Sequence, residues 1–409
     1  MRRTAILAIG ALAVVGGLGL GMFAALASAP TPSHPTGSNN VAGLGSARPA
    51  ASPPPTGGPS LPPASPPPSA EPTPTPSPTP VLVPAPLTGR LVSPAAAARH
   101  PIAVMVDDLS PARPQSGFNS ASIVWQAPAE GGIPRYMMVF QENIPTDVGP
   151  VRSSRYYYIA WAAELDALYA HAGGSPQALA TLRNQGSGQL VYNADEFRWG
   201  NSFRRSPLPL NVYGQQRVGP HNLYTTGKQL REIARTVGAK DGPISWPWTF
   251  APDAPLADRP TGGKIQVTYS NVNAIRFDYD RFSNTYLRSV TGEKKQIDGA
   301  TGKRVAPKNV VVMVVKFGPL NDGSKKHRLE GDVIGSGHAW ISTNGVTIQG
   351  TWKKTSLKSP TRLFDKAGNP VVLTVGQTFV QVMKTTDVIS FTAGKPVPPD
   401  VFGHGMRAI

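Results

Sequence analysis

Cysteine is missing from all 409 residues of the chain. This absence excludes a disulfide, a thiolate metal site, a cysteine nucleophile and a lipidated cysteine that would tether the protein to a membrane. It does not exclude export, because a folded part of roughly 320 residues buries enough apolar surface without covalent cross-links. The fold must therefore be held by non-covalent packing alone.

The familiar catalytic signatures are missing as well. The sequence has no Gly-x-Ser-x-Gly elbow, no phosphate-binding Gly-x-x-x-x-Gly-Lys loop and no His-Glu-x-x-His pair, and its seven histidines show no metal-ligand spacing. These absences disfavour a serine hydrolase or metalloenzyme of a common type. We predict neither a cofactor nor a metal.

Charge is absent from residues 5–27, which follow Arg2 and Arg3. As a helix this stretch would be about 34 Å long, enough to cross a bilayer. The preceding cations favour a cytoplasmic N-terminus, so we expect the remainder of the chain on the extracytoplasmic face of the membrane. Residues 1–28 are either a retained signal-anchor, which the length favours, or a signal peptide cleaved after Ala27, which would release the protein.

Charged and aromatic residues are scarce in the next segment. Residues 29–88 contain only Arg48 and Glu71 as fixed charges, and residues 30–86 hold 20 of the 44 prolines. Such a composition cannot assemble a core and predicts a disordered linker with polyproline II character. It is either a stalk that lifts a folded domain away from the membrane or filler without a function.

Basic residues outnumber acidic residues in the part of the chain that follows the linker. Residues 89–409 carry 37 basic and 23 acidic side chains, a net charge of +14. Outside a cell this charge favours wall polymers, anionic glycans or lipid headgroups, so the expected partners are an anionic envelope component and the membrane through the N-terminal helix. No run of lysine or arginine is interleaved with aromatic residues, so we expect no nucleic acid. The sequence identifies no protein partner.

The hydrophobic pattern changes near residue 260 and predicts an α+β fold. Residues 89–240 mix strand and helix patterns and form a mixed α/β domain that carries the polar motifs. Residues 263–390 are nearly all strand-like and predict a mainly antiparallel β domain. A connector rich in proline and tryptophan, residues 241–262, joins the two domains, and residues 391–409 form a C-terminal tail.

Some element boundaries have local signals. We expect helices at residues 156–168, 176–183 and 227–237. The last of these should begin with a capping box in which Thr226 and Gln229 cap each other. Asn344-Gly345 predicts a tight hairpin turn between two strands.

Arginines and acids recur in short glycine-containing motifs between residues 107 and 155. Glycine lets the backbone approach a ligand closely, and guanidinium groups hold an anion in a fixed geometry. Arg152 and Arg155 stand at the start of the helix expected at residues 156–168, where a cation opposes the helix dipole, so a nearby acid or ligand is expected. A solvated basic face is the plainer interpretation. The candidate ligand-binding arginines are Arg113, Arg135, Arg152 and Arg155.

A second motif leads from a predicted strand into a helix. In His171-Ala172-Gly173-Gly174-Ser175-Pro176, Ser175 is the predicted N-cap and Pro176 the first helical residue. Free amides and the positive end of a helix dipole would favour an anion here. We therefore count His171, Gly173, Gly174 and Ser175 as candidate ligand-binding residues, with a plain capped turn and a buried histidine as the alternative.

Acid–base chemistry has three candidates, namely Asp107, Glu130 and His221. A carboxyl pair, or a carboxyl with an imidazole, could transfer protons, with Asn222 as a hydrogen-bond donor to a ligand. The alternative is that both acids are salt-bridge partners of the arginines. Sequence alone does not show which of these groups meet.

Taken together, these motifs resemble the YerB lipoprotein family over about residues 86–385. The resemblance implies an exported bacterial protein built from an N-terminal and a C-terminal domain, with no settled activity. The family usually has asparagine where Asp108 stands and an acid where Gln126 stands. Its members are typically tethered through a lipidated cysteine, so this chain would have to use its hydrophobic span. The motifs that carry the resemblance are Val104 to Asp107, Ala112 to Gly117, Glu130 to Gly132, Gly149 to Ser153, His171 to Pro176, Pro220 to Tyr224, Gly350 to Trp352 and Gly376 to Thr378.

Three functional hypotheses follow. The first is a membrane-anchored binding or regulatory module whose pocket of arginine, histidine and Glu130 holds an anionic envelope ligand. The second is a hydrolase or transferase acting on envelope glycan or phosphodiester. The third is a purely structural role for the motifs. Convergence of a carboxyl and His221 around one cleft would favour the enzyme, whereas acids that are all engaged in salt bridges would favour binding.

Overall fold

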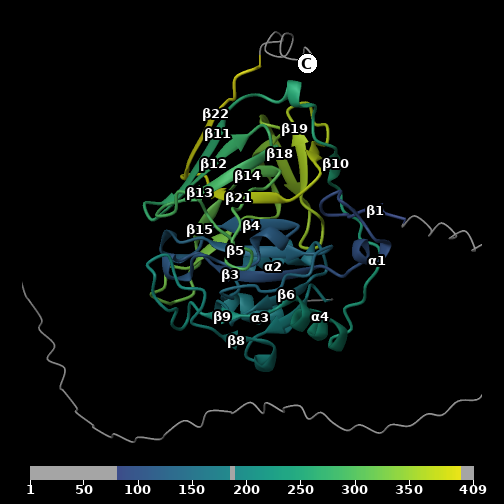
Figure 1. The fold of residues 1–409 in the computed structure, drawn as a ribbon. Coiled ribbons are helices and arrows are strands. Elements are labelled where there is room, and N and C mark those ends of the chain that lie inside the picture. Colours follow the sequence, from purple (N-terminus) through teal and green to yellow (C-terminus); the bar gives the residue numbers. More distant parts are fainter. Residues whose placement is uncertain (1–80, 185–188, 398–409) are drawn as a thin grey trace, which may run out of the picture. The chain divides into compact units, whose positions relative to one another are not determined.

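The computed structural model of the protein describes residues 81–184 and 189–397. The expected membrane span, the linker up to residue 80 and the tail beyond residue 397 lie outside the described residues. Within the two described ranges, no helix is long and apolar enough to cross a membrane. The structure is drawn in Figure 1.

One ten-stranded sheet runs through both halves of the described chain. Its strand order is β19-β18-β17-β14-β21-β4-β5-β3-β6-β7. The two halves meet where β21 pairs in parallel with β4, with Phe379 opposite Val124. Strands from the two predicted domains therefore share one sheet. Its members are β3 (Ile102–Asp107), β4 (Ile123–Ala127), β5 (Arg135–Phe140), β6 (Leu168–His171), β7 (Tyr192–Asp195), β14 (Asn309–Val315), β17 (Gly335–Thr343), β18 (Val346–Lys354), β19 (Arg362–Asp365) and β21 (Thr378–Lys384).

A four-stranded antiparallel sheet, in the order β13-β12-β11-β22, packs on one face of the large sheet. Its strands alternate buried and exposed residues, as expected for a sheet with one covered face. Phe277 of this sheet contacts Phe379 of the large sheet, with ring centroids 6.1 Å apart. The strands are β11 (Lys264–Ser270), β12 (Asn273–Asp280), β13 (Thr285–Val290) and β22 (Val388–Thr392). The α+β class predicted from the sequence is confirmed.

Helix α2 covers the opposite face of the large sheet. Strand β3 is buried throughout, because Ala103 and Met105 face this helix whereas Val104 faces the other core. Trp161 of the helix stacks on Trp125 of β4 at a centroid distance of 4.7 Å. The helices are α1 (Pro94–Ala97), α2 (Tyr156–Ala163), α3 (Pro176–Asn184) and α4 (Gly227–Thr236).

Short strands complete the described chain. They form two-stranded sheets in the pairs β1-β2, β8-β9, β10-β20 and β15-β16. Two of these pairs border the candidate site described below. The strands are β1 (Val83–Pro84), β2 (Leu91–Val92), β8 (Arg204–Arg205), β9 (Leu223–Tyr224), β10 (Thr249–Ala251), β15 (Phe317–Pro319), β16 (Leu329–Gly331) and β20 (Val372–Thr374).

Most local predictions agree with the structure. The capping box of α4 is present, and Asn344 and Gly345 both have positive φ in the turn between β17 and β18. The helix expected at 156–168 was too long, because α2 ends at Ala163. Asp166, with φ of +48°, makes the turn that lets the chain enter β6 at Leu168.

Candidate functional site

The candidate site begins where β3 ends beside the first residue of β5. The two strands are antiparallel, and Asp107 lies directly opposite Arg135 in the register. Asp107 lies two residues after Met105, and Arg135 lies two residues before Met137. Because side chains on a strand alternate between its two faces, both lie on the same face as these methionines, the face toward α2. The two oppositely charged side chains therefore lie on the face of the sheet that α2 covers, at the ends of two interior strands.

Asp107 is held by three groups. His221 Nδ1 and Arg152 Nε lie 2.7 Å and 2.9 Å from its Oδ2 atom, and the backbone amide of Leu109 donates to Oδ1 at 3.1 Å. Burial of this carboxyl alone would raise its pKa. The hydrogen bond from His221 and the charges of Arg152 and Arg135 outweigh burial and hold the pKa of Asp107 below its usual value. Asp107 is therefore a fixed anion that orients a histidine and an arginine.

Glu130 lies among three guanidinium groups. Arg155 donates two hydrogen bonds of 2.7 Å to its two carboxylate oxygens, and Arg135 and Arg328 each lie 3.8 Å away. Burial would raise the pKa of Glu130, but the bonds from Arg155 and the charge of Arg135 lower it overall. Glu130 stands on a short turn, Glu130–Gly132, whose two glycines have positive φ.

Arg135 lies between the two acids and is poorly satisfied. Its Nε and Nη1 atoms are inaccessible to solvent and, among the described residues, have no hydrogen-bond partner. Burial, together with the charges of Arg155 and Arg152, lowers its pKa to about 10 despite the attraction of Asp107 and Glu130. The side chain as a whole is 14% exposed. Burying a guanidinium without full pairing costs free energy.

We call Arg135, Arg152, Arg155 and Arg328 the arginine cluster. Three carboxylates contact it, those of Asp107, Glu130 and Asp322, the last bound to Arg328 Nη1. Four guanidinium groups thus face three carboxylates. The local excess is one positive charge, before any charge on His221 is counted.

His221 presents one ring nitrogen to the site. Its Nδ1 atom is bound to Asp107, and the described part of the chain supplies no hydrogen-bond partner for Nε2. The side chain is 17% exposed. An imidazole oriented by a carboxylate at Nδ1 is the usual arrangement of a histidine that exchanges protons through Nε2. Its neighbour Asn222 accepts a hydrogen bond from Arg205 at 3.3 Å.

The loop after His171 contacts the backbone segment that carries Arg155. His171 is fully buried, and its Nδ1 and Nε2 atoms lie 2.8 Å from the Gly173 carbonyl and from Asn193 Oδ1. The Gly173 amide donates to Asp195, and Ser175 caps α3 by accepting from the Ala178 amide. Gly174 forms a backbone bridge with Ser154, next to Arg155. This geometry favours the interpretation in which these residues form a capped turn that positions Arg155.

Arg113 belongs to a different, fully buried network. It is 1% exposed and donates to Asp108 Oδ1 at 3.1 Å and to the Thr291 carbonyl at 2.9 Å, so it joins the two halves of the chain. Gln126 donates to Asp108 Oδ2 at 2.6 Å and accepts from Arg288 at 2.7 Å. The two positions at which the sequence departs from the YerB pattern therefore touch each other, and the pair still comprises one carboxylate and one amide.

Two family models match, the N-terminal domain of a protein of unknown function (DUF3048) over residues 87–240 and the C-terminal domain of the same family over residues 265–380. The chain belongs to the DUF3048 family. It is 30% identical over 316 residues to the Bacillus subtilis (strain 168) protein named "Putative lipoprotein YerB", covering 76% of this chain and 90% of that protein.

A solved structure agrees with this assignment. The crystal structure of YerB protein from Bacillus subtilis matches the fold with a TM-score of 0.65 at 27% identity, over 75% of this chain and 99% of that chain. The resemblance to the YerB family drawn from the motifs is confirmed. The family description names no activity, so function has to be argued from the site.

Arg328 was missed at the sequence level. It stands immediately before the short strand β16, in the half of the chain where no site was expected. The only signal was the basic run Lys325-Lys326-His327-Arg328, which sequence analysis cannot distinguish from a solvated turn. Only the tertiary fold brings it to Glu130.

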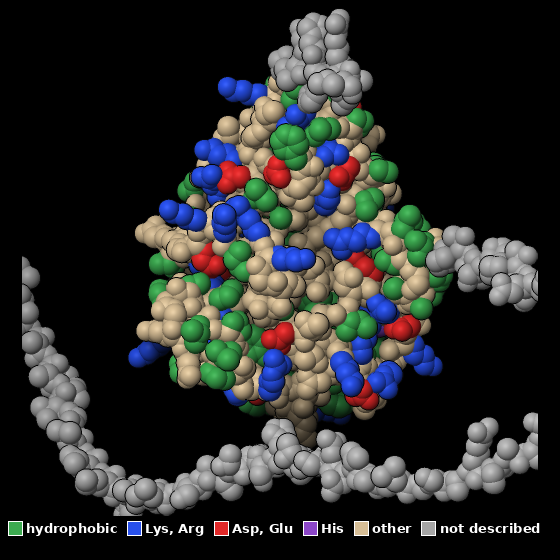
Figure 2. Space-filling view, in the orientation of Figure 1, with side chains coloured by type: hydrophobic (Ala, Val, Ile, Leu, Met, Phe, Trp, Pro, Cys, Tyr) green, Lys and Arg blue, Asp and Glu red, His purple; other side chains and the backbone are tan. Residues whose placement is uncertain are grey.

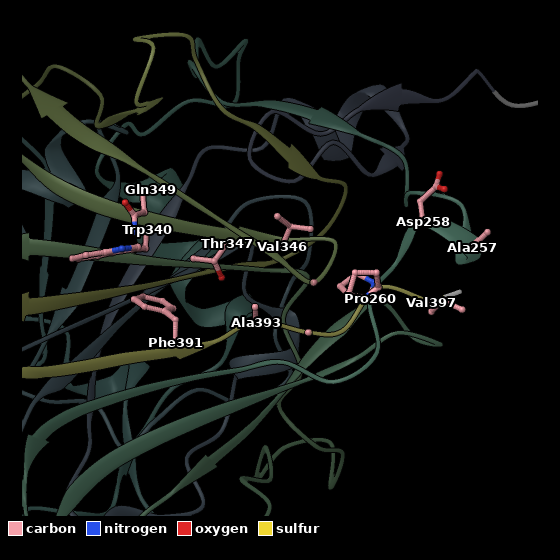
Figure 3. Close-up of a pocket in the computed structure, with 13 residues that line it drawn as sticks. Ala257, Asp258, Pro260, Trp340, Val346, Thr347, Gln349, Phe391, Ala393 and Val397 are labelled. Carbon is pink, nitrogen blue, oxygen red and sulfur yellow. The ribbon is translucent and has the colours of Figure 1, made fainter. Parts of the chain in front are cut away.

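The cavities described elsewhere on the molecule have different linings. One of about 600 Å³ lies between β17, β18 and β22, where Trp340 and Phe391 approach with ring centroids 5.4 Å apart (Figure 3). None of the candidate site residues lines it. Within residues 81–184 and 189–397, no group of three histidine, aspartate or glutamate side chains is arranged to hold a metal ion.

Proposed function

We propose that this protein binds an anionic group of a cell-envelope ligand at the arginine cluster. The observation that carries the proposal is Arg135, whose buried Nε and Nη1 atoms have no hydrogen-bond partner among the described residues, while the surrounding charges leave one positive charge uncompensated. An anion would supply both the missing hydrogen-bond acceptors and the missing charge. The remaining surface supports attraction of such a ligand, because basic side chains are spread over the face drawn in Figure 2.

Glu130 occupies the ligand's position in the free protein. Its carboxylate already lies against Arg155 and within 3.8 Å of Arg135 and Arg328. In the turn that carries it, space is open beside Gly131 whereas Gly132 lies close to Ser270, so the turn has room to move on the Gly131 side. In this proposal the ligand displaces Glu130 from Arg135 and Arg328 and gains access to the buried nitrogens.

The relative and the N-terminal sequence together support a proposal for the cellular location. The relative is named "Putative lipoprotein YerB", and in this chain Arg2 and Arg3 precede an uncharged stretch, with no cysteine available for lipidation. We infer an envelope protein that is exported and held by a single N-terminal span, with the described domain on the extracytoplasmic face. Wall polymers and other anionic envelope components are then the available ligands.

The Asp107–His221 pair supports a second candidate, a phosphodiesterase. In such a reaction His221 Nε2 takes a proton from water as the water oxygen bonds to phosphorus, and the imidazolium returns the proton to the departing alkoxide as the P–O bond breaks. The arginine cluster would stabilise the charge on the phosphoryl oxygens. Glycan cleavage is less favoured, because Glu130 is tied to Arg155 by two bonds and is not a free second carboxyl.

Titration calorimetry of the full-length protein with glycerol phosphate tests the proposal. Arg135→Gln and Arg152→Gln should each weaken binding at least about tenfold, the loss expected for a charged hydrogen bond. Arg276→Gln, on an exposed arginine of β12, is the matched control and should bind normally. Absence of saturable binding, or an equal loss in the control, would overturn the proposal. Thermal melting separates loss of binding from loss of fold.

The enzyme alternative is tested in the same samples. Mass spectrometry of the protein incubated with glycerol phosphodiesters, muropeptides and teichoic-type polymers should show a product that disappears in His221→Ala. Binding without turnover in the wild type would exclude phosphodiester hydrolysis and leave the binding function.

A further inference from the structure

The β15–β16 hairpin of the second half closes one end of the arginine cluster. Arg328 Nη1 is held by Asp322 and by Ser324, the latter at 3.0 Å, while its Nε faces Glu130. Glu330 accepts a hydrogen bond of 2.9 Å from Gln177 and ties the hairpin to α3. The loop of this hairpin carries three further basic residues that are exposed, Lys325, Lys326 and His327.

The β8–β9 pair forms the opposite end. Asn222, next to His221, accepts a hydrogen bond from Arg205, whose side chain is 51% exposed and also lies 3.5 Å from Glu196. Arg204 is 46% exposed and pairs with Asp147 at 2.9 Å. Contacts therefore connect Arg205, through Asn222 and its neighbour His221, to Asp107 and Arg152. From Asp107 the row continues across the β3–β5 pair to Arg135, and through Glu130 to Arg328.

We call Arg205, the arginine cluster, Lys325 and Lys326 the basic strip. Five of its seven cationic side chains contact four carboxylates, namely Asp107, Glu130, Glu196 and Asp322, and the two lysines are exposed. The excess is three positive charges, and much of it lies outside the buried centre. A ligand carrying one anionic group would leave both ends of the strip unused.

We infer that the ligand is a linear polymer of phosphodiesters that lies along the basic strip, with one phosphate in the arginine cluster and others at the two ends. This inference rests on the proposed function and names its ligand class. Phosphate fits the centre better than carboxylate, because the guanidinium groups arrive from three separate segments and a tetrahedral group offers oxygens in several directions. The planar carboxylate of Glu130 makes both its close bonds with Arg155 alone.

The test compares glycerol phosphate with oligomers of poly(glycerol phosphate) of two lengths, using the full-length protein. The longer oligomer should bind at least about tenfold more tightly than the monomer, because several phosphates release counterions together. If three additional phosphates are contacted, raising the salt from about 50 to about 200 mM should weaken the oligomer roughly 20-fold more than the monomer.

Paired variants localise the effect. Lys325→Ser with Lys326→Ser, and separately Arg205→Ser, should reduce oligomer affinity and leave monomer affinity unchanged. Lys294→Ser with Lys295→Ser is the matched control, since these are also adjacent exposed lysines of the second half. All four lysines are exposed, so failure to fold is not expected to confuse the comparison.

The outcomes separate this inference from the proposed function. Equal affinity for monomer and oligomer, or an equal loss in the Lys294/Lys295 control, would overturn the polymer while leaving the anion site. Tighter binding of polyglutamate than of the phosphate oligomer would overturn the phosphate class. Failure of the monomer to bind at all would instead refute the proposed function.

Discussion

The replacement Glu130→Gln gives the sharpest prediction, because two views of Glu130 predict opposite signs. If Glu130 helps to bind ligand or performs catalysis, its loss should weaken binding. If Glu130 occupies the anion position, as its contacts with Arg155, Arg135 and Arg328 indicate, removal of its charge should strengthen ligand binding. Glutamine keeps the size and one acceptor for Arg155, so the turn at Glu130–Gly132 can be preserved.

The size of the effect follows from the geometry. Glu130 Oε2 lies 3.8 Å from Arg135 Nη2, and an anion bound to that nitrogen at about 2.9 Å would lie roughly 5 Å from the carboxylate. Two unit charges at about 5 Å repel by about 3 kcal/mol at an effective dielectric constant near 20. Glu130 is 17% exposed and can turn toward water, so we expect about half of this energy, or roughly a tenfold gain in affinity.

Calorimetric titration with glycerol phosphate measures this gain. Glu232→Gln is the control, because Glu232 is an exposed glutamate that also pairs with an arginine, Arg235 on α4. The control should bind like the wild type. A weaker Kd for Glu130→Gln, in a protein whose melting temperature is unchanged, would refute the view that Glu130 holds the ligand's place.

Three other predictions concern stability. Lys354→Met should destabilise the protein by about 3–5 kcal/mol in urea unfolding, since it leaves the fully buried Glu164 without its cation, and adding Glu164→Gln should recover part of the loss. The pKa of Asp107 in the folded protein lies below its ordinary value of 3.8, so its ionised carboxylate stabilises the fold at neutral pH. This contribution is lost as the pH falls from 3.8 through the lower folded pKa. Asp107→Asn should therefore show a smaller acid-dependent drop in melting temperature than the wild type. Gly350→Ala should prevent the β18–β19 pairing, because its new methyl group would lie 1.8 Å from the Phe364 carbonyl, whereas Gly318→Ala, which meets no atom within 4 Å, should melt normally.

Local features of this protein were predictable because each depends on a few neighbouring residues. The capping box of Thr226 and Gln229 and the turn at Asn344-Gly345 are both set by short-range backbone geometry. The length of α2 was not predictable in the same way. Apolar residues continue past Ala163 because β6 follows, and hydrophobicity alone does not separate a buried helix end from a buried strand.

The residues of the candidate site could be recognised singly in the sequence, but their grouping could not. That Asp107, Arg135, Arg152 and Arg155 stand in polar motifs is visible in the sequence, but their grouping depends on the β3–β5 register. Arg113 has the same residue type in a similar motif, yet it lies in the buried network at Asp108.

Pairing between strands that are distant in the sequence explains why Arg328 was not predicted to belong to the site. Arg328 reaches Glu130 only because strands of both halves share one sheet through β4 and β21. Such long-range pairing leaves no periodic signal in the sequence of either partner.

The central claim is that a ligand anion meets Arg135. Side-chain NMR of the ¹⁵N-labelled full-length protein tests it directly, with the Arg135 Nε–H signal identified by its absence in Arg135→Lys. We predict that this signal shifts saturably as glycerol phosphate is added, with the midpoint found by calorimetry. A signal that stays in place while binding heat is still released would contradict the account, since the anion would then be bound elsewhere.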